Sequence, residues 1–223
     1  PARFGPEDLS GKLKAKAALL CAFSLPAEAT ALDRPLVGLV SRMTDQKGFD
    51  LIALALPGLL KLDATFVLLG SGESRYEEQW EAVAADHPAR VGVRIGFDEA
   101  LAHLIEAGAD IFLMPSRFEP CGLNQMYSLR YGTVPVVRAT GGLDDTVVNY
   151  NERSGRGTGF KFAEYTAPAL VRTMKRALKV FGDRKRWRAL QLAGMRQDFS
   201  WDVSAREYVK VYRNVRRRFD GIR

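Results

Sequence analysis

The amino-acid sequence predicts an α/β fold, a Rossmann-like parallel sheet with helices on both faces. Strand-like apolar runs alternate with helix-length segments along most of the 223 residues, which is the pattern of βα units. The strand-like runs are apolar almost without interruption, as is typical of strands that are covered on both faces. The connections between them are short, which favours right-handed crossovers and one open sheet.

The predicted strands are spaced so that one helix fits between each pair. Strands are expected at residues 35–41, 64–70, 90–96, 110–115 and 133–138, with a weaker one at 157–162. Helices are expected at residues 46–60, 74–86, 99–107, 123–131, 168–181, 185–195 and 203–218. The chain therefore reads as one domain, with a lead-in segment at 1–25, βα repeats at 26–165 and C-terminal helices at 166–223.

Composition excludes several classes of protein. Hydrophobic residues make up 47% and charged residues 26% of the chain, which is typical of a folded globular domain. No apolar run is long enough to cross a bilayer and no secretory signal is present, so we expect a cytoplasmic protein without a membrane partner. Cys21 and Cys121 form no CxxC pair, and no strand-end loop carries an Asp-x-Asp or His-rich cluster. We therefore expect no disulfide, no metal and no cofactor.

The net charge of +7 suits an anionic partner. Much of the excess lies in the last fifty residues, where a solvated basic helical face explains it. Nucleic-acid binding through residues 216–218 is an alternative, but aromatic residues do not interleave that run. We expect no nucleic-acid partner.

Ligands of an open parallel sheet bind beyond the carboxyl ends of its strands, so the loops after the strands hold the candidate site. The first such loop contains Arg42 and Lys47 near a helix start. A guanidinium, an ammonium and free helix N–H groups together suit a diphosphate. The same two residues also fit as ordinary loop charges, and this segment alone leaves both interpretations open.

The next two loops carry weaker signals. Gly70 and Gly72 allow close approach of a ligand to the backbone, or form a simple tight turn. Arg75 replaces the third glycine of a dinucleotide fingerprint, which disfavours NAD binding. Phe97 follows the third strand, where its ring either lies on a purine or packs in the core.

The fourth loop, residues 115–125, is the most informative. Pro120 restricts Glu119 to extended geometry, and Gly122 allows close backbone approach where a helix begins. A carboxylate and several N–H donors then converge, with Glu119 suited to a polyol and the amides of residues 122–124 to a phosphate. Alternatively, Glu119 is a helix-entry charge between two turn residues. Thr140 and Gly141 form a further turn that meets phosphate or is only a bend.

These residues resemble one known family, the bacterial glycogen synthases and plant starch synthases. The resemblance spans nearly all of the chain and is carried by GLVSRMTDQKGFDLI (residues 38–52), SRFEPCGLNQ (residues 116–125) and DFSWDVSAREYVKVY (residues 198–212). It implies two Rossmann-like domains facing each other across a cleft (a GT-B fold), of which this chain is similar to the C-terminal, donor-binding one. It also implies transfer of glucose from ADP-glucose to the non-reducing end of an α-1,4-glucan with retention.

The resemblance implies roles for particular residues. Arg42 and Lys47 match the cations that hold the donor diphosphate, and Glu119 matches the carboxylate that grips the glucose hydroxyls. The segment that contains Cys121, Gly122, Leu123 and Asn124 matches the loop around sugar and phosphate, with Asn124 where threonine is frequent. Gly72, Thr140 and Gly141 are also expected to contact the nucleotide sugar, on the basis of their place in the loops after the strands and not of the resemblance.

Two further positions refine the resemblance. Phe97 stands where many members carry a tyrosine stacked on adenine. Tyr127 stands where a related branch of retaining glycosyltransferases has a second glutamate, which favours the glycogen synthase branch. Base choice between ADP-glucose and UDP-glucose stays open.

The acceptor-binding half of such an enzyme is absent from this sequence, as is its Lys-x-Gly-Gly motif. His87 and His103 match neither that half nor its histidine near the reacting sugar. We therefore expect a C-terminal fragment that binds ADP or ADP-glucose but is inactive alone, and that meets the glucan through the missing half. The alternatives are a stand-alone nucleotide-sugar binding module and another retaining glycosyltransferase of this fold. The last helix, with Trp201, Tyr208 and Tyr212, is expected to pack on the missing half or to allow self-association.

Overall fold

The structure is a computed structural model that describes residues 2–220, without the side chains of Arg218 and Asp220. Its centre is a six-stranded parallel sheet in the order β3-β2-β1-β4-β5-β6. The strands are β1 (Leu36–Val40), β2 (Thr65–Gly70), β3 (Val91–Ile95), β4 (Ile111–Met114), β5 (Val134–Arg138) and β6 (Phe160–Phe162). Each lies within its expected range, so the predicted α/β fold is confirmed.

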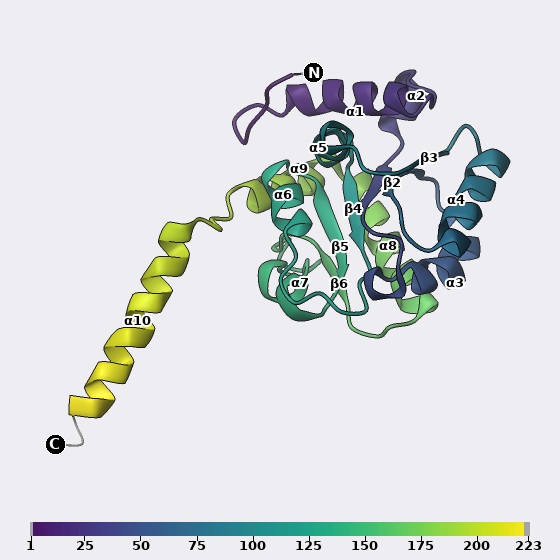
Figure 1. Ribbon diagram of the computed structural model, residues 1–223. Coiled ribbons are helices and arrows are strands. Elements are labelled where there is room, and N and C mark those ends of the chain that lie inside the picture. Colours follow the sequence, from purple (N-terminus) through teal and green to yellow (C-terminus); the bar gives the residue numbers. More distant parts are fainter. Residues whose placement is uncertain (1, 221–223) are drawn as a thin grey trace.

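Helices cover both faces of this sheet, as Figure 1 shows. They are α1 (Ser10–Ala22), α2 (Ala29–Asp33), α3 (Phe49–Leu59), α4 (Ser74–Asp86), α5 (Glu99–Gly108), α6 (Asn124–Arg130), α7 (Gly141–Thr146), α8 (Ala167–Gly182), α9 (Arg184–Met195) and α10 (Trp201–Asp220). Of the predictions above, Pro1, residues 221–223 and the Arg218 side chain lie outside the described residues. Within the described part of the chain, every helix is too short or too polar to span a bilayer.

Successive side chains of the apolar strands point alternately into two hydrophobic cores. In β2, Phe66 and Leu68 join the larger core with residues of α3, α4 and α8, whereas Val67 and Leu69 join the smaller core with residues of α1 and α5. Successive side chains of a strand point to opposite faces, so a strand covered on both sides needs an unbroken apolar run. This explains why these strands lack the polar alternation of a half-exposed sheet.

The order of the strands places the candidate site. Strand β1 lies at the centre, with Val37 opposite both Phe66 of β2 and Ile111 of β4. The chain first builds outward from β1 through β2 to β3 and then returns to the other side of β1 with β4. The loops after β1 and β4 diverge at this reversal, which is where open α/β sheets bind ligands.

The helix predicted at residues 46–60 is interrupted, and this part of the prediction is wrong. A short 3-10 turn, η1 (Asp45–Lys47), precedes α3, and Gly48 between them has a left-handed φ of 84°. A Cβ on Gly48 would lie 2.2 Å from the carbonyl oxygen of Pro115. The chain turns sharply here because the loop after β4 packs directly against it.

The lead-in segment contains a helix that the sequence analysis did not predict. Helix α1 packs on α5 and buries two lysines, Lys12 and Lys16. The Lys12 ammonium donates to the carbonyl oxygens of Ala107 at 3.0 Å and Tyr131 at 3.2 Å, and Lys16 pairs with Asp110 at 2.6 Å. Burial lowers the pKa of Lys12 to about 7. Because two of the buried positions of α1 are lysines, the sequence shows no clear apolar helical pattern in this segment.

The last helix, α10, extends away from the body of the protein (Figure 1). Trp201, Tyr208 and Tyr212 are exposed on it. The expected contact of this helix with a further domain, or with a second copy of the chain, stays a prediction.

Candidate nucleotide-sugar site

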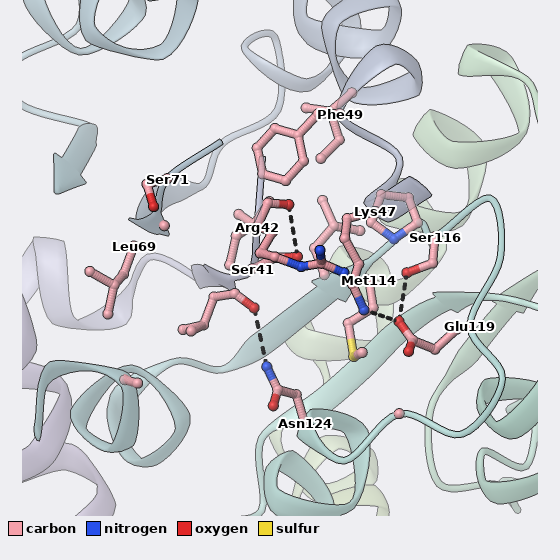
Figure 2. Close-up of a pocket in the computed structure, with 18 of the residues that line it drawn as sticks. Ser41, Arg42, Lys47, Phe49, Leu69, Ser71, Met114, Ser116, Glu119 and Asn124 are labelled. Atoms are coloured by element: carbon pink, nitrogen blue, oxygen red, sulfur yellow. Dashed lines mark hydrogen bonds and ion pairs between the residues drawn. The ribbon is translucent and has the colours of Figure 1, made fainter. Parts of the chain in front are cut away.

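One cavity of about 440 Å³ lies beyond the carboxyl ends of β1, β2, β3 and β4. Figure 2 shows its charged and polar side chains converging from the loop after β1 and the loop after β4. The side chains and backbone that line it include most of the predicted site. They are Leu39, Val40, Ser41, Arg42, Lys47, Phe49, Ile52, Leu69, Gly70, Ser71, Gly96, Phe97, Ala102, Leu113, Met114, Pro115, Ser116, Glu119, Gly122, Leu123 and Asn124.

The loop after β1 brings both predicted cations to the cavity. Arg42 directly follows Ser41 at the end of the strand, and its guanidinium donates to Gln46 Oε1 at 3.5 Å. Lys47 ends the η1 turn and points across the cavity toward the loop after β4 (Figure 2). Two cations that line one cavity suit an anionic ligand. The interpretation of this segment as a diphosphate site stays a prediction.

The loop after β4 places Glu119 opposite Lys47. The Lys47 ammonium lies 2.5 Å from Glu119 Oε2, and the Ser116 hydroxyl donates to the same oxygen at 3.3 Å. Glu119 is buried although it is charged. The pairing with Lys47 compensates much of the cost of removing this carboxylate from water.

Backbone contacts hold the two loops together behind this ion pair. The amide of Arg117 donates to the carbonyl oxygen of Gln46 at 2.9 Å, one residue before Lys47. This hydrogen bond ties the backbone just before Lys47 to the loop that carries Glu119.

Arg138, at the end of β5, supports the Glu119 loop and was missed by the sequence analysis. Its Nε donates to the carbonyl oxygen of Ser116 at 2.9 Å, and its Nη2 donates to the carbonyl oxygen of Arg117. Bonds from a charged donor are stronger than neutral ones. A polar residue closing an apolar strand was the available signal, but its carbonyl partners are visible only in three dimensions.

Gln125 is a second support that the sequence analysis did not identify. It is fully buried and its Nε2 donates to the carbonyl oxygens of Cys121 at 3.1 Å and Gly122 at 3.0 Å. Gly122 has a left-handed φ of 73°, which the segment needs for its tight turn. The Gln125 side chain thus fixes the backbone that follows Glu119.

Two tyrosines fix the η1 turn and α3 from outside the cavity. Tyr165 donates to Asp50 at 2.5 Å, and burial followed by this bond raises the pKa of Tyr165 to about 12. Tyr76 donates to Asp45, which lowers the pKa of that carboxyl, while burial raises the pKa of Tyr76. Both phenols stay protonated at neutral pH and act as fixed donors.

The start of α6 forms the floor of the cavity. Asn124 donates from its amide nitrogen to the carbonyl oxygen of Val40 at 3.1 Å (Figure 2). Gly122 and Leu123 line the cavity beside it. The Asn124 side chain links α6 to the end of β1, so its amide is already engaged by the protein.

Phe97 lies at the rim, with 90% of the residue exposed. The alternative that it packs in the core is therefore wrong. An exposed ring on the wall of a cavity provides an apolar face for a flat ligand group.

Four predicted contact residues do not line the cavity as the described residues form it. A Cβ on Gly72 would lie 2.3 Å from the carbonyl oxygen of Met43, and one on Gly141 would lie 2.1 Å from that of Glu119. These glycines make room for neighbouring backbone. Thr140 precedes α7, so the predicted glycine turn begins a short helix, and Cys121 is exposed. A ligand contact at these four residues stays a prediction.

Comparisons with known proteins give the following matches. A family model described as "Glycosyl transferases group 1" matches residues 24–189. The protein named glycogen synthase from Anaeromyxobacter dehalogenans (strain 2CP-C) is 59% identical over 215 residues, covering 96% of this chain and 44% of that protein. The protein named glycogen synthase from Koribacter versatilis (strain Ellin345) is 52% identical over the same shares of each chain.

A solved structure is also similar. It is the catalytic domain of starch synthase IV from Arabidopsis thaliana bound to ADP and acarbose, with a TM-score of 0.85 and 37% sequence identity. The match covers 96% of this chain and 44% of that one. This chain thus spans less than half the length of the curated relatives that it matches.

Proposed function

The chain belongs to the glycosyl transferases group 1 family, and from this premise we propose that it binds the nucleotide-sugar donor of a glycogen or starch synthase reaction. In that reaction glucose passes from ADP-glucose to the non-reducing end of an α-1,4-glucan with retention of configuration. The similarity to proteins named glycogen synthase supports this choice within the family.

One observation carries the proposal: two cations and one buried carboxylate line the same cavity. Arg42 and Lys47 suit the diphosphate of the donor, because a guanidinium and an ammonium together stabilise several phosphate oxygens. Glu119 suits the sugar, because a carboxylate accepts hydrogen bonds from hydroxyl groups. A nucleotide sugar carries both groups next to each other, and neither a free sugar nor a free phosphate does.

The proposed mechanism is electrostatic. The bond between glucose and diphosphate lengthens toward an oxocarbenium-like state, and negative charge grows on the leaving diphosphate. Arg42 and Lys47 stabilise that charge from positions that are set before the reaction begins. Glu119 holds the hexosyl group and does not form a covalent bond to it. No step needs a metal ion, and we expect turnover to be unchanged by EDTA.

The rim of the cavity suits the nucleobase. Phe97 presents an exposed ring on which a base can stack. The similar starch synthase structure is described as bound to ADP, which supports adenine over uracil as the base. We propose a cytoplasmic reaction, and we propose that the glucan binds mainly to the part of the relatives that this chain does not span.

Calorimetry with ADP and ADP-glucose tests the proposal, together with a glucan-elongation assay on the same chain. Both nucleotides should bind, and Arg42→Ala and Lys47→Ala should each weaken ADP-glucose binding. In a protein that contains this chain and elongates glucan, each change should lower turnover by ~10²–10³-fold and leave the affinity for glucan nearly unchanged. Arg172→Ala is the matched control, because Arg172 of α8 pairs only with Glu164 among the described ion pairs, and both side chains are exposed. Failure of both nucleotides to bind would overturn the proposal.

The elongation assay decides between two versions of this function. Binding without elongation favours a donor-binding module, an alternative supported by the 44% share of the relatives that the chain covers. Binding with elongation shows that this chain alone carries the catalytic groups.

A further inference from the structure

The two cations of the site differ in what they contact. The Lys47 ammonium lies 2.5 Å from Glu119 Oε2, with side-chain exposures of 21% for Lys47 and 8% for Glu119. Arg42 contacts no carboxylate among the described ion pairs, and its neighbour is the neutral side chain of Gln46. Arg42 is therefore ready for an anion, whereas the charge of Lys47 is already compensated by Glu119.

We propose that Glu119 makes the site selective for a sugar-loaded nucleotide over the free nucleoside diphosphate, by competing with the diphosphate for Lys47. This inference rests on the proposed function, because it takes the diphosphate to bind at Arg42 and Lys47. Glu119 then has a second role beside holding the sugar. It keeps the site from retaining the diphosphate product.

The physical reason is whether the Glu119 carboxylate still has a partner after each ligand has bound. A free diphosphate that takes Lys47 leaves a buried carboxylate without its cation, and an uncompensated buried charge is strongly destabilising. If Lys47 stays on Glu119, the diphosphate keeps only Arg42. A sugar-loaded nucleotide avoids this choice, because its hydroxyl groups donate to Glu119 while Lys47 turns to the diphosphate.

The backbone around Glu119 prevents it from moving aside. The amide of Gly142 donates to the carbonyl oxygen of Glu119 at 3.1 Å. Gly141 also packs against that oxygen. On the opposite side, Gln46 O accepts from the amide of Arg117. Glu119 and Lys47 thus stay within reach, and the competition has to be resolved by their side chains.

The central experiment compares ADP with ADP-glucose by calorimetry on the wild type and on Glu119→Gln. The substitution keeps the shape of the side chain and removes its charge, so Lys47 becomes free for the diphosphate. We expect ADP to bind roughly tenfold tighter than to the wild type. ADP-glucose should gain less or lose affinity, so the preference for the sugar-loaded nucleotide shrinks.

Two further variants connect this effect to Lys47. In the background Lys47→Ala, adding Glu119→Gln should no longer tighten ADP binding, because no cation remains to be released. Asp144→Asn is the matched control. It removes a carboxylate that lies 2.5 Å from Lys161, outside the residues that line the cavity, and it should leave ADP affinity unchanged.

A measurement on the wild type keeps the test independent of whether Glu119→Gln folds. Glucose added at millimolar concentration should tighten ADP binding, because its hydroxyl groups replace Lys47 at Glu119. If the wild type binds ADP with an affinity that neither glucose nor Glu119→Gln raises, the competition is refuted and the proposed function stands. If the wild type binds neither ADP nor ADP-glucose, the proposed function itself fails.

Discussion

Gly70 at the end of β2 lies directly against Ser41, the first residue after β1. A Cβ on Gly70 would be 1.9 Å from the Ser41 carbonyl oxygen. Met43 and Gly72 continue this contact as a parallel bridge. Gly70 and Gly72 are therefore needed to let the loop that carries Arg42 and Lys47 pack against the end of β2 and the loop that follows it.

Gly70→Ala should destabilise the protein, because the added methyl group requires the two strand ends to separate. We expect the free energy of unfolding to fall by about 1–3 kcal/mol, measured by urea denaturation, together with weaker ADP-glucose binding. Gly182→Ala is the control, since nothing lies within 4 Å of its added Cβ, and we expect it to keep the stability of the wild type. Equal stabilities of the two variants would contradict this account of the loop.

Phe97→Ala should weaken the binding of ADP by removing the stacking surface at the rim. Loss of one base-stacking ring costs about 1–3 kcal/mol, which is roughly 5- to 150-fold in Kd. Phe97→Tyr should bind nearly as well as the wild type in the same titration. Phe118→Ala is a suitable control, because Phe118 is also exposed but does not line the cavity. If Phe97→Ala binds ADP with wild-type affinity, the Phe97 ring does not contribute to nucleotide binding.

Arg138→Ala should reduce selectivity for the sugar-loaded nucleotide more than it reduces affinity for ADP. Arg138 holds the carbonyl oxygens of Ser116 and Arg117, so its loss frees the loop that positions Glu119. Each bond to a charged donor contributes about 1.5–3 kcal/mol, and we expect a fall in the ADP-glucose to ADP affinity ratio of at least about tenfold. Arg186→Ala, which breaks an exposed pair with Asp183, should leave the ratio unchanged. A uniform loss for both ligands would indicate that Arg138 acts only on stability.

Glu106 should make stability depend on pH. It is buried in α5 beside Ser128, whose hydroxyl lies 2.5 Å from its carboxyl, and burial raises the pKa of Glu106 from 4.5 to about 8. The folded protein therefore keeps a proton that the unfolded chain releases above pH 4.5. By linkage, this stabilisation is complete below pH 4.5 and is lost as pH rises to about 8.

Thermal melts of the wild type and Glu106→Gln between pH 5 and 8 measure this effect. The amide cannot ionise, so the variant should gain melting temperature relative to the wild type as pH rises, by about 2–4 °C for each kcal/mol. Lys12 has the opposite sign over a higher range. Its pKa is lowered to about 7, so its destabilisation decreases as pH rises above that value. A constant difference between the two proteins across pH 5–8 would show that Glu106 stays in one protonation state.

The sequence by itself determined the α/β fold, the segments in which the strands lie and the four loops that hold the candidate site. Strands buried on both faces need apolar side chains at every position, so local pattern and strand position coincide. The loops follow from the strands, because all carboxyl ends of a parallel sheet share one edge. Arg42, Lys47 and Glu119 could thus be singled out before their distances were known.

Only the tertiary structure decided which of these groups touch. Lys47 and Glu119 are 72 residues apart, and their contact depends on two loops that no local pattern brings into register. The same holds for Arg138, for the glycines that face neighbouring carbonyl groups and for the buried lysines of α1. Hydrogen bonds and ion pairs act over a few ångströms. The sequence therefore predicts which residues can bind a ligand, and the packing of the loops decides which of these side chains lie in contact with one another.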